Sequence, residues 1–144
     1  MIVSQILQSK PNHDVSTISG TKTVSDAAQT MADMRFGALV VSEDGKTVDG
    51  ILSERDIVRE IGKRGAGCLA DIVRNIMTKN IIACAKTDLA DAVLATMTKQ
   101  RFRHMPVLEA GAMVGLISIG DVVNARLSEM SMENEALESM IKGF

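Results

Sequence analysis

The octapeptide GILSERDI at residues 50–57 recurs as GLISIGDV at residues 115–122, 65 positions later. Shorter pairs with nearly the same offset are Asp26-Ala27 with Asp91-Ala92, and Met31 and Arg35-Phe36 with Met97 and Arg101-Phe102. A period of this length that occurs only twice is too long for a solenoid array. It predicts two copies of one small α/β unit, packed about a pseudo-two-fold axis as one compact α+β module.

Each copy is expected to contain the same order of elements. In the first copy these are a strand at 15–18, a helix at 24–34, strands at 38–41 and 48–52 around a turn at 43–46, and a helix at 54–61. In the second they are a strand at 81–84, a helix at 88–100, strands at 104–108 and 113–117 around a turn at 109–112, and a helix at 119–127. The chain is thereby divided into a first repeat with the N-terminal segment (1–66), a second repeat (67–128) and a helical tail (129–144), with a linker at 62–67.

Composition excludes several classes of protein. Apolar residues make up 46% and charged residues 24% of the chain, which is ordinary for a globular protein. A net charge of −2 and only three aromatic residues argue against a nucleic-acid or anionic-membrane partner. The longest apolar run has five residues, so no membrane span or secretory signal is expected. Cys68 and Cys84, with no CxxC motif, indicate reduced thiols of a cytoplasmic protein.

The doubled motif resembles the cystathionine β-synthase (CBS) domain family, as a stand-alone tandem pair. Four stretches carry the resemblance: the two Gly-hydrophobic-hydrophobic-Ser-x-x-Asp runs at 50–56 and 115–121, RFRHMPV at 101–107, and DIVRNIMTKN at 71–80. The resemblance covers roughly residues 3–127 and implies β-α-β-β-α repeats, two clefts between them, adenosine-type ligands and disc-like dimers. The first copy departs from the pattern, because Gly37 and Ala38 stand where the second copy has Arg103 and His104.

Ser53 with Asp56, and Ser118 with Asp121, stand where a strand ends and a helix begins. The structural alternative is a capping box, with Ser at the N-cap and a carboxylate three residues later. A carboxylate also accepts both hydroxyl protons of a ribose diol, and a helix N-terminus attracts phosphate. The duplication and the resemblance favour ribose binding by both aspartates.

The resemblance implies further ligand contacts. Arg103 and His104 are expected on phosphate in the cleft of Asp121, whereas Lys99 and Arg101 are expected to be solvated cations at a helix end. Additional candidates are Lys10 and Thr78 before the first strands, Ser16 and Ile82 on those strands against the adenine edge, and Arg55 on phosphate or on the helix surface. Because Gly37 and Ala38 supply no cation, the cleft of Asp56 is expected to bind more weakly or to take a different ligand.

These features predict a non-enzymatic regulatory, energy-sensing module for AMP, ADP, ATP or NAD(H), with AMP or NAD(H) favoured and an unidentified target protein as a further partner. No nucleophile–base pair, metal cluster or catalytic cofactor is expected. The alternatives are a structural dimerisation module with vestigial clefts, and an enzyme acting on nucleotides. A homodimer is expected through the helices that begin at Val24, Glu54, Asp88 and Ile119. Residues 128–144 read either as a frayed terminal helix or as a helix on a partner subunit.

Overall fold

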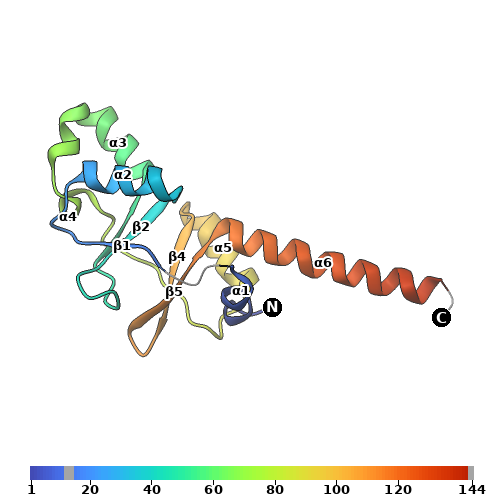
Figure 1. The fold of residues 1–144 in the computed structure, drawn as a ribbon. Helices are drawn as coiled ribbons and strands as arrows, with labels where there is room; N and C mark the ends of the chain where they lie inside the picture. The colour runs from blue at the N-terminus through green and yellow to red at the C-terminus, as the bar shows by residue number, and fades with distance from the viewer. Residues whose placement is uncertain (12–14, 143–144) are drawn as a thin grey trace.

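The computed structural model describes residues 1–11 and 15–142. The first repeat contains β1 (Thr17–Ile18), α2 (Val24–Met34), β2 (Ala38–Val41), β3 (Gly50–Ser53) and α3 (Glu54–Arg64). The second contains α5 (Ala90–Gln100), β4 (His104–Glu109), β5 (Ala112–Ser118) and α6 (Ile119–Ile141). Three short helices lie outside this pattern: α1 (Val3–Ser9), a 3₁₀ helix (Ala66–Ala70) and α4 (Val73–Ile76). The mixed α+β architecture with two repeats is therefore confirmed (Figure 1).

Each repeat has its own small sheet. In the first, β1 pairs in parallel with β2, and β2 pairs antiparallel with β3. In the second, β4 and β5 form an antiparallel hairpin whose turn holds Ala110 and Gly111 at positive φ. The expected strand at 81–84 is reduced to an isolated parallel bridge between Cys84 and Val107. Of residues 81–84, only Cys84 forms backbone hydrogen bonds with β4, through Pro106 and Leu108. The expectation of a buried strand at 81–84 was therefore wrong.

The two repeats exchange short helices. Val3 and Ile6 of α1 are buried in the core of the second repeat, with Val93, Met105 and Ile117. In the same way Val73 of α4, at the beginning of the second repeat, is buried in the core of the first. Neither helix was expected from the sequence, because their apolar faces are only one or two turns long. The division of the chain at 66/67 stays a prediction, and α1 packs on the half that follows this boundary.

A glycine at the start of β3 and another in the middle of β5 allow α1 and the residues that follow α4 to approach the two sheets. A Cβ on Gly50 would lie 2.5 Å from Met77 Sδ and 2.9 Å from the Thr78 carbonyl oxygen. A Cβ on Gly115 would lie 2.8 Å from Leu7 Cδ2. Both glycines belong to the repeated octapeptide, so the close approach of the repeats is encoded in the motif itself.

Three helices begin with a capping box. The Ser53 hydroxyl accepts from the Asp56 backbone N–H at 3.2 Å, and the Asp56 carboxylate accepts from the Ser53 N–H at 2.9 Å. Ser118 and Asp121 make the same pair of bonds at the start of α6, at 3.0 and 2.9 Å. Thr23 and Asp26 do so at the start of α2. The structural alternative for the two Ser-x-x-Asp motifs is thus realised, so any ligand role must be additional to capping.

Three helix ends differ from the expected ones, and the first is the start of α5, which lies at Ala90 instead of Asp88. Helix α3 runs three residues beyond Ile61 to Arg64, and Gly65 ends it at a φ of 79°, which favours glycine. Helix α6 does not end at Leu127 but continues to Ile141, and Figure 1 shows its second half projecting from the body. Over residues 1–11 and 15–142, no helix has the length and apolar character needed to span a bilayer.

Candidate ligand-binding clefts

Within residues 1–11 and 15–142, two clefts of about 380 and 330 Å³ lie between the repeats. Each cleft combines the start of a helix in one repeat with the start of a strand in the other. The first unites Ser118 and Asp121 of α6 with Gly37 and Ala38 at β2. The second unites Ser53 and Asp56 of α3 with Arg103 and His104 at β4. Volumes of this size suit a small organic ligand.

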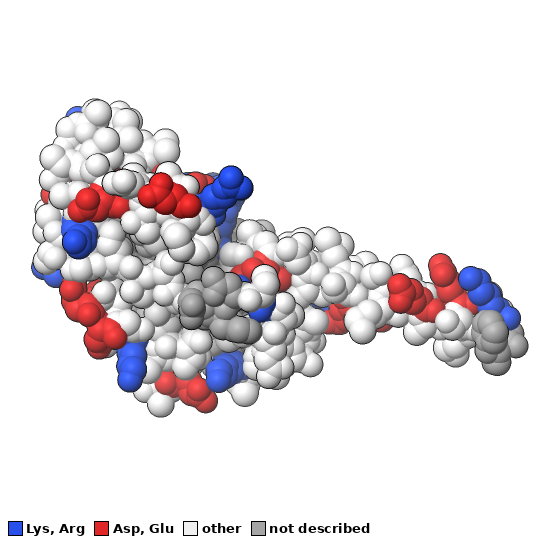
Figure 2. Space-filling model, in the orientation of Figure 1, with Lys and Arg blue, Asp and Glu red and all other residues white. Residues whose placement is uncertain are grey.

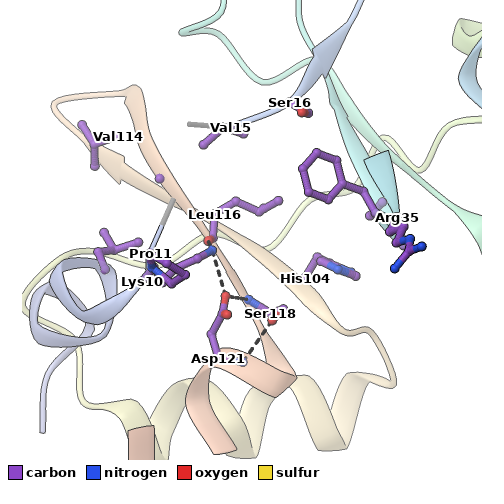
Figure 3. Close-up of a pocket in the computed structure, with 15 residues that line it drawn as sticks. Lys10, Pro11, Val15, Ser16, Arg35, His104, Val114, Leu116, Ser118 and Asp121 are labelled. Carbon is purple, nitrogen blue, oxygen red and sulfur yellow. Dashed lines mark hydrogen bonds and ion pairs between the residues drawn. The ribbon is translucent and has the colours of Figure 1, made fainter. Parts of the chain in front are cut away.

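In the Asp121 cleft, the carboxylate is held by two donors. Oδ2 of Asp121 accepts from the Ser118 N–H at 2.9 Å and pairs with Lys10 Nζ at 2.9 Å (Figure 3). Lys10 also donates to the Leu116 carbonyl at 2.8 Å. Burial opposes ionisation of Asp121, but the Ser118 N–H and the Lys10 ammonium outweigh it and lower the pKa of this carboxyl. Among the described residues, Oδ1 of Asp121 accepts no hydrogen bond, so one oxygen remains available to a ligand hydroxyl.

Apolar side chains form much of this cleft. Ser16, expected near the adenine edge, lies on its wall, and its carbonyl accepts from the Val40 N–H in the sheet. The remaining lining residues with apolar side chains are Leu7, Pro11, Val15, Phe36, Ala38, Val114 and Leu116. A flat aromatic base is the kind of group that such a wall accommodates.

The Asp56 cleft is richer in cations. Four arginines line it: Arg55, Arg59, Arg101 and Arg103. Arg59 lies 3.5 Å from Asp56 Oδ1, whereas Arg55, Arg101 and Arg103 have no carboxylate within ion-pair distance in the described part of the chain. The expected residues Thr78 and Ile82 also line this cleft, and the Thr78 hydroxyl lies 3.5 Å from Asp56 Oδ1. Unpaired guanidinium groups around a cleft are suited to phosphate.

His104 and Gly37 line both clefts and form a common wall between them. A Cβ on Gly37 would lie 3.6 Å from His104 Cε1, so the imidazole stands directly beside the glycine backbone. Burial is the main cause that lowers the pKa of His104. The positive charges of Lys10 and Arg103 lower this pKa further, whereas the carboxylates of Asp121 and Glu54 partly raise it. The imidazole is therefore neutral at pH 7 and presents one donor and one acceptor.

Two sequence-based expectations about the cations are wrong. Arg103 does not line the Asp121 cleft but the Asp56 cleft. Arg101 is exposed at the end of α5, as expected, but it also lines the Asp56 cleft, which was not expected. The reason is that each helix start faces the strand of the opposite repeat, so Arg103 lies in the cleft of the first copy's aspartate, and His104 lines both clefts. Weaker ligand binding in the Asp56 cleft was expected because this cleft was thought to lack a cation. This reason does not hold, because more cations line the Asp56 cleft than the Asp121 cleft.

The Arg-Phe pairs at the ends of α2 and α5 were not expected to line the clefts. Arg35 and Arg101 adopt left-handed conformations, with φ of 56° and 58°, and turn the chain into β2 and β4. Arg35 and Phe36 consequently line the Asp121 cleft, and Arg101 and Phe102 line the Asp56 cleft. The signal was present, because Arg-Phe recurs in both copies at nearly the repeat offset.

Other reactive groups lie outside the clefts or are inert. No cluster of three or more His, Cys, Asp or Glu side chains suited to a metal occurs in the part of the chain that the structure describes. Cys68 and Cys84 are both buried and unpaired. Burial, with the nearby Asp88, raises the pKa of the Cys84 thiol to about 11, so it stays protonated at neutral pH.

Two paired repeats, with one cleft at the start of α3 and one at the start of α6, define a CBS pair. The chain belongs to the CBS domain family, whose sequence pattern matches residues 3–63 and 73–128. Among curated proteins, the mitochondrial CBS domain-containing protein CBSX3 of Arabidopsis thaliana is 38% identical over 126 residues, 84% of this chain. The chain spans 61% of the length of CBSX3 and 24% of that of CBSCBSPB1 from the same plant.

Solved structures show the same fold. A CBS-domain containing protein from Agrobacterium tumefaciens is 40% identical, with a TM-score of 0.83 over 88% of this chain and 99% of its own. The CBS domain pair of protein MJ0100, in complex with 5′-methylthioadenosine and S-adenosyl-L-methionine, is 22% identical, with a TM-score of 0.76 over 90% of this chain and 98% of its own.

Proposed function

We propose that this protein is a regulatory module that binds adenine nucleotides in its two clefts and catalyses no reaction. The observation that carries the proposal is the Asp56 cleft, in which a carboxylate at a helix start faces three arginines without carboxylate partners among the described residues. The carboxylate suits a ribose diol and the guanidinium groups suit phosphate. A CBS pair of the same fold holds two adenosine-containing molecules, which supports this ligand class.

The two clefts differ in the ligand that they favour. Arg55, Arg101 and Arg103 favour di- and triphosphates or NAD(H) in the Asp56 cleft. Lys10, which is already paired with Asp121, and the apolar wall favour a ligand with less phosphate in the Asp121 cleft. Ser53 and Ser118 cap their helices and lie beside the ligand phosphate, and Thr78 and Ile82 lie beside its ribose and base.

Calorimetric titration of the nucleotide-free protein with adenosine, AMP, ADP, ATP, NAD⁺ and NADH tests the proposal. We expect affinity at one site to rise with phosphate number. Arg103→Met should weaken that site by about ten- to a hundredfold, the value of one charge-assisted hydrogen bond. Arg74→Met is the matched control, because Arg74 lies near Glu43 and outside both clefts, and should leave the affinity unchanged.

Three outcomes would contradict the proposal. Binding of none of these ligands would favour a structural dimerisation module. Conversion of a bound nucleotide into product, followed by chromatography, would favour an enzyme. Equal losses from Arg103→Met and Arg74→Met would remove the phosphate role of the cleft.

A cytoplasmic regulator of this kind acts on a target protein through its ligand-dependent surface. Mass spectrometry of small molecules that co-purify with the protein would identify the ligand independently of any candidate set.

A further inference from the structure

Among residues 1–11 and 15–142, no other element covers the second half of α6. Every residue from Met130 to Lys142 is exposed, and Figure 1 shows this part of the helix extending away from both repeats. A lone helix of this length in water gains little from propensity, and most helices in proteins are stabilised by packing of an apolar face. We therefore expect another surface to pack against this part of the helix.

One stripe of the helix follows a coiled-coil spacing. Its members, at intervals of 4, 3, 4, 3 and 4, are Val123, Leu127, Met130, Asn134, Leu137 and Ile141. The five apolar members are between 41% and 82% exposed. The helix packs on the body through another side, which includes Val122 and Ala125 and lies roughly 130° away at about 100° per residue. The stripe is thus continuous from the body to the end of the helix and is left uncovered over its whole length.

In heptad terms, Leu127, Asn134 and Ile141 occupy a positions, and Val123, Met130 and Leu137 occupy d positions. A single Asn at an a position amid apolar neighbours specifies two strands, in parallel and in register, because the two amides then hydrogen-bond to each other. In an antiparallel pair Asn134 would face a d residue such as Met130 and leave its amide unsatisfied. The pattern selects a second copy of the same helix over an unrelated apolar surface.

We propose that α6 pairs with α6 of a second copy of this chain as a short parallel coiled coil over residues 123–141. The helix begins with Ser118 and Asp121, so the pairing joins the Asp121 clefts of the two copies through one continuous element per chain. The surface differs from the exposed apolar residues of α2 and α3, Met34, Val58 and Ile61, which belong to the body.

Charge limits the strength of this pairing. Glu133 and Glu138 occupy the g and e positions, so in a parallel pair Glu133 of one copy faces Glu138 of the other. Figure 2 shows the acidic character of this part of the helix. Like charges at these positions oppose association and are screened by salt, so we expect pairing to tighten as ionic strength rises.

Disulfide trapping in the full chain tests the geometry. Leu137→Cys at a d position should form a disulfide-linked dimer on oxidation, and Glu135→Cys at an outward b position should link several-fold less. The native Cys68 and Cys84 are buried and do not compete. Equal trapping at positions 135 and 137 would overturn the proposal. So would preferential trapping of Leu127→Cys with Leu137→Cys, which is the antiparallel product.

A charge reversal gives a second, independent measurement. Glu133→Lys converts two repulsive contacts into two attractive ones and should tighten dimerisation in sedimentation by about tenfold. Glu135→Lys makes the same charge change on the outward face and should alter it less than about twofold. Equal effects of the two variants would show that net charge, and not pairing of this stripe, controls association, and would overturn the proposal. Neither test requires a ligand, so the outcome is separate from that of the nucleotide titrations.

Discussion

At the scale of single residues, the paired aspartates have two roles that the structure separates. Asp56 and Asp121 cap their helices through one carboxylate oxygen, Oδ2, which accepts the N–H of the preceding serine. The second oxygen of Asp121 has no donor among the described residues, and that of Asp56 has only donors at 3.5 Å. A ligand hydroxyl can therefore use this oxygen without opening the cap.

Asp121→Asn should cost on the order of 1–3 kcal/mol of nucleotide binding, because an amide has only one oxygen to accept the ribose hydroxyls. Asp26→Asn is the control, since Asp26 closes the same kind of capping box outside both clefts. Both variants should lower the free energy of unfolding by a similar amount, on the order of 1 kcal/mol, because each weakens a capping box. Asp121→Asn also loses the ion pair with Lys10, which adds no more than about 1 kcal/mol because both side chains are partly exposed. A 2′-deoxy ligand should bind the wild-type protein less tightly than the ribose ligand does. The Asp121→Asn variant should bind the two ligands with almost equal affinity. If Asp121→Asn alone lowers the melting temperature sharply and leaves the nucleotide affinity unchanged, the Asp121 carboxylate only caps its helix and does not bind the ligand.

His104 should make binding depend on pH. Its pKa is lowered in the folded protein, chiefly by burial, so the ligand-free protein loses stability as pH falls below about 6.5, where the unfolded chain takes up the proton first. A bound phosphate adds negative charge beside the imidazole and raises its pKa again, so binding takes up a proton and strengthens from pH 8 to 6.5. Calorimetry in buffers of different ionisation enthalpy measures this proton, and His104→Gln should abolish it. The same proton uptake in wild type and variant would assign it elsewhere.

At the scale of elements, the exchange of α1 and α4 depends on two glycines in the repeated motif. Gly50→Ala should destabilise the protein by about 1–3 kcal/mol, because its Cβ would meet the backbone oxygen of Thr78 as well as Met77. Gly115→Ala should cost less, since it meets only the flexible end of Leu7. Urea unfolding provides the comparison.

Gly62 is the contrasting position for that experiment. It lies inside α3, and a Cβ there would have nothing within 4 Å. Gly62→Ala should therefore raise stability, by up to about 1 kcal/mol of helix propensity. Equal destabilisation by Gly50→Ala and Gly62→Ala would show that the glycine at position 50 is not needed for the close approach of Met77 and Thr78.

At the scale of the whole molecule, the two clefts share one wall. Gly37→Val should weaken ligand binding in both, by about tenfold each, because the side chain would occupy space beside His104 on either side. Ala38→Val adds less bulk and lines the Asp121 cleft alone, so it should weaken only that site. Site-resolved titration by NMR measures both, and a loss confined to one cleft for Gly37→Val would contradict the shared wall.

The body of the molecule is also expected to associate as a homodimer. The apolar side chains of Met34 in α2 and of Val58 and Ile61 in α3 are exposed by 53%, 68% and 39%, and exposed apolar side chains favour an interface. Sedimentation at micromolar concentration should give about twice the 15.4 kDa of one chain, and Val58→Asp should weaken the association. A monomer at that concentration would contradict both this interface and the pairing of α6.

Much of the fold was readable from particular residues. The span of α2, the span of β2 and the start of α3 and α6 agree with the sequence prediction, because apolar periodicity and Ser-x-x-Asp caps are local signals. The assignment of Asp56, Asp121 and the residues around them to clefts followed from the repeated octapeptide and the family resemblance.

Sequence alone determined that the chain contains two copies of one unit and where each copy starts its capped helix, because those properties depend on residues close together in the chain. Tertiary structure decided which cations face which aspartate, since Arg103 reaches the Asp56 cleft only through the packing of one repeat against the other. It also decided that α1 and α4 cross to the opposite core, and that the stripe of α6 stays exposed. These are relations between segments far apart in sequence, and a pseudo-two-fold arrangement places equivalent residues in opposite clefts.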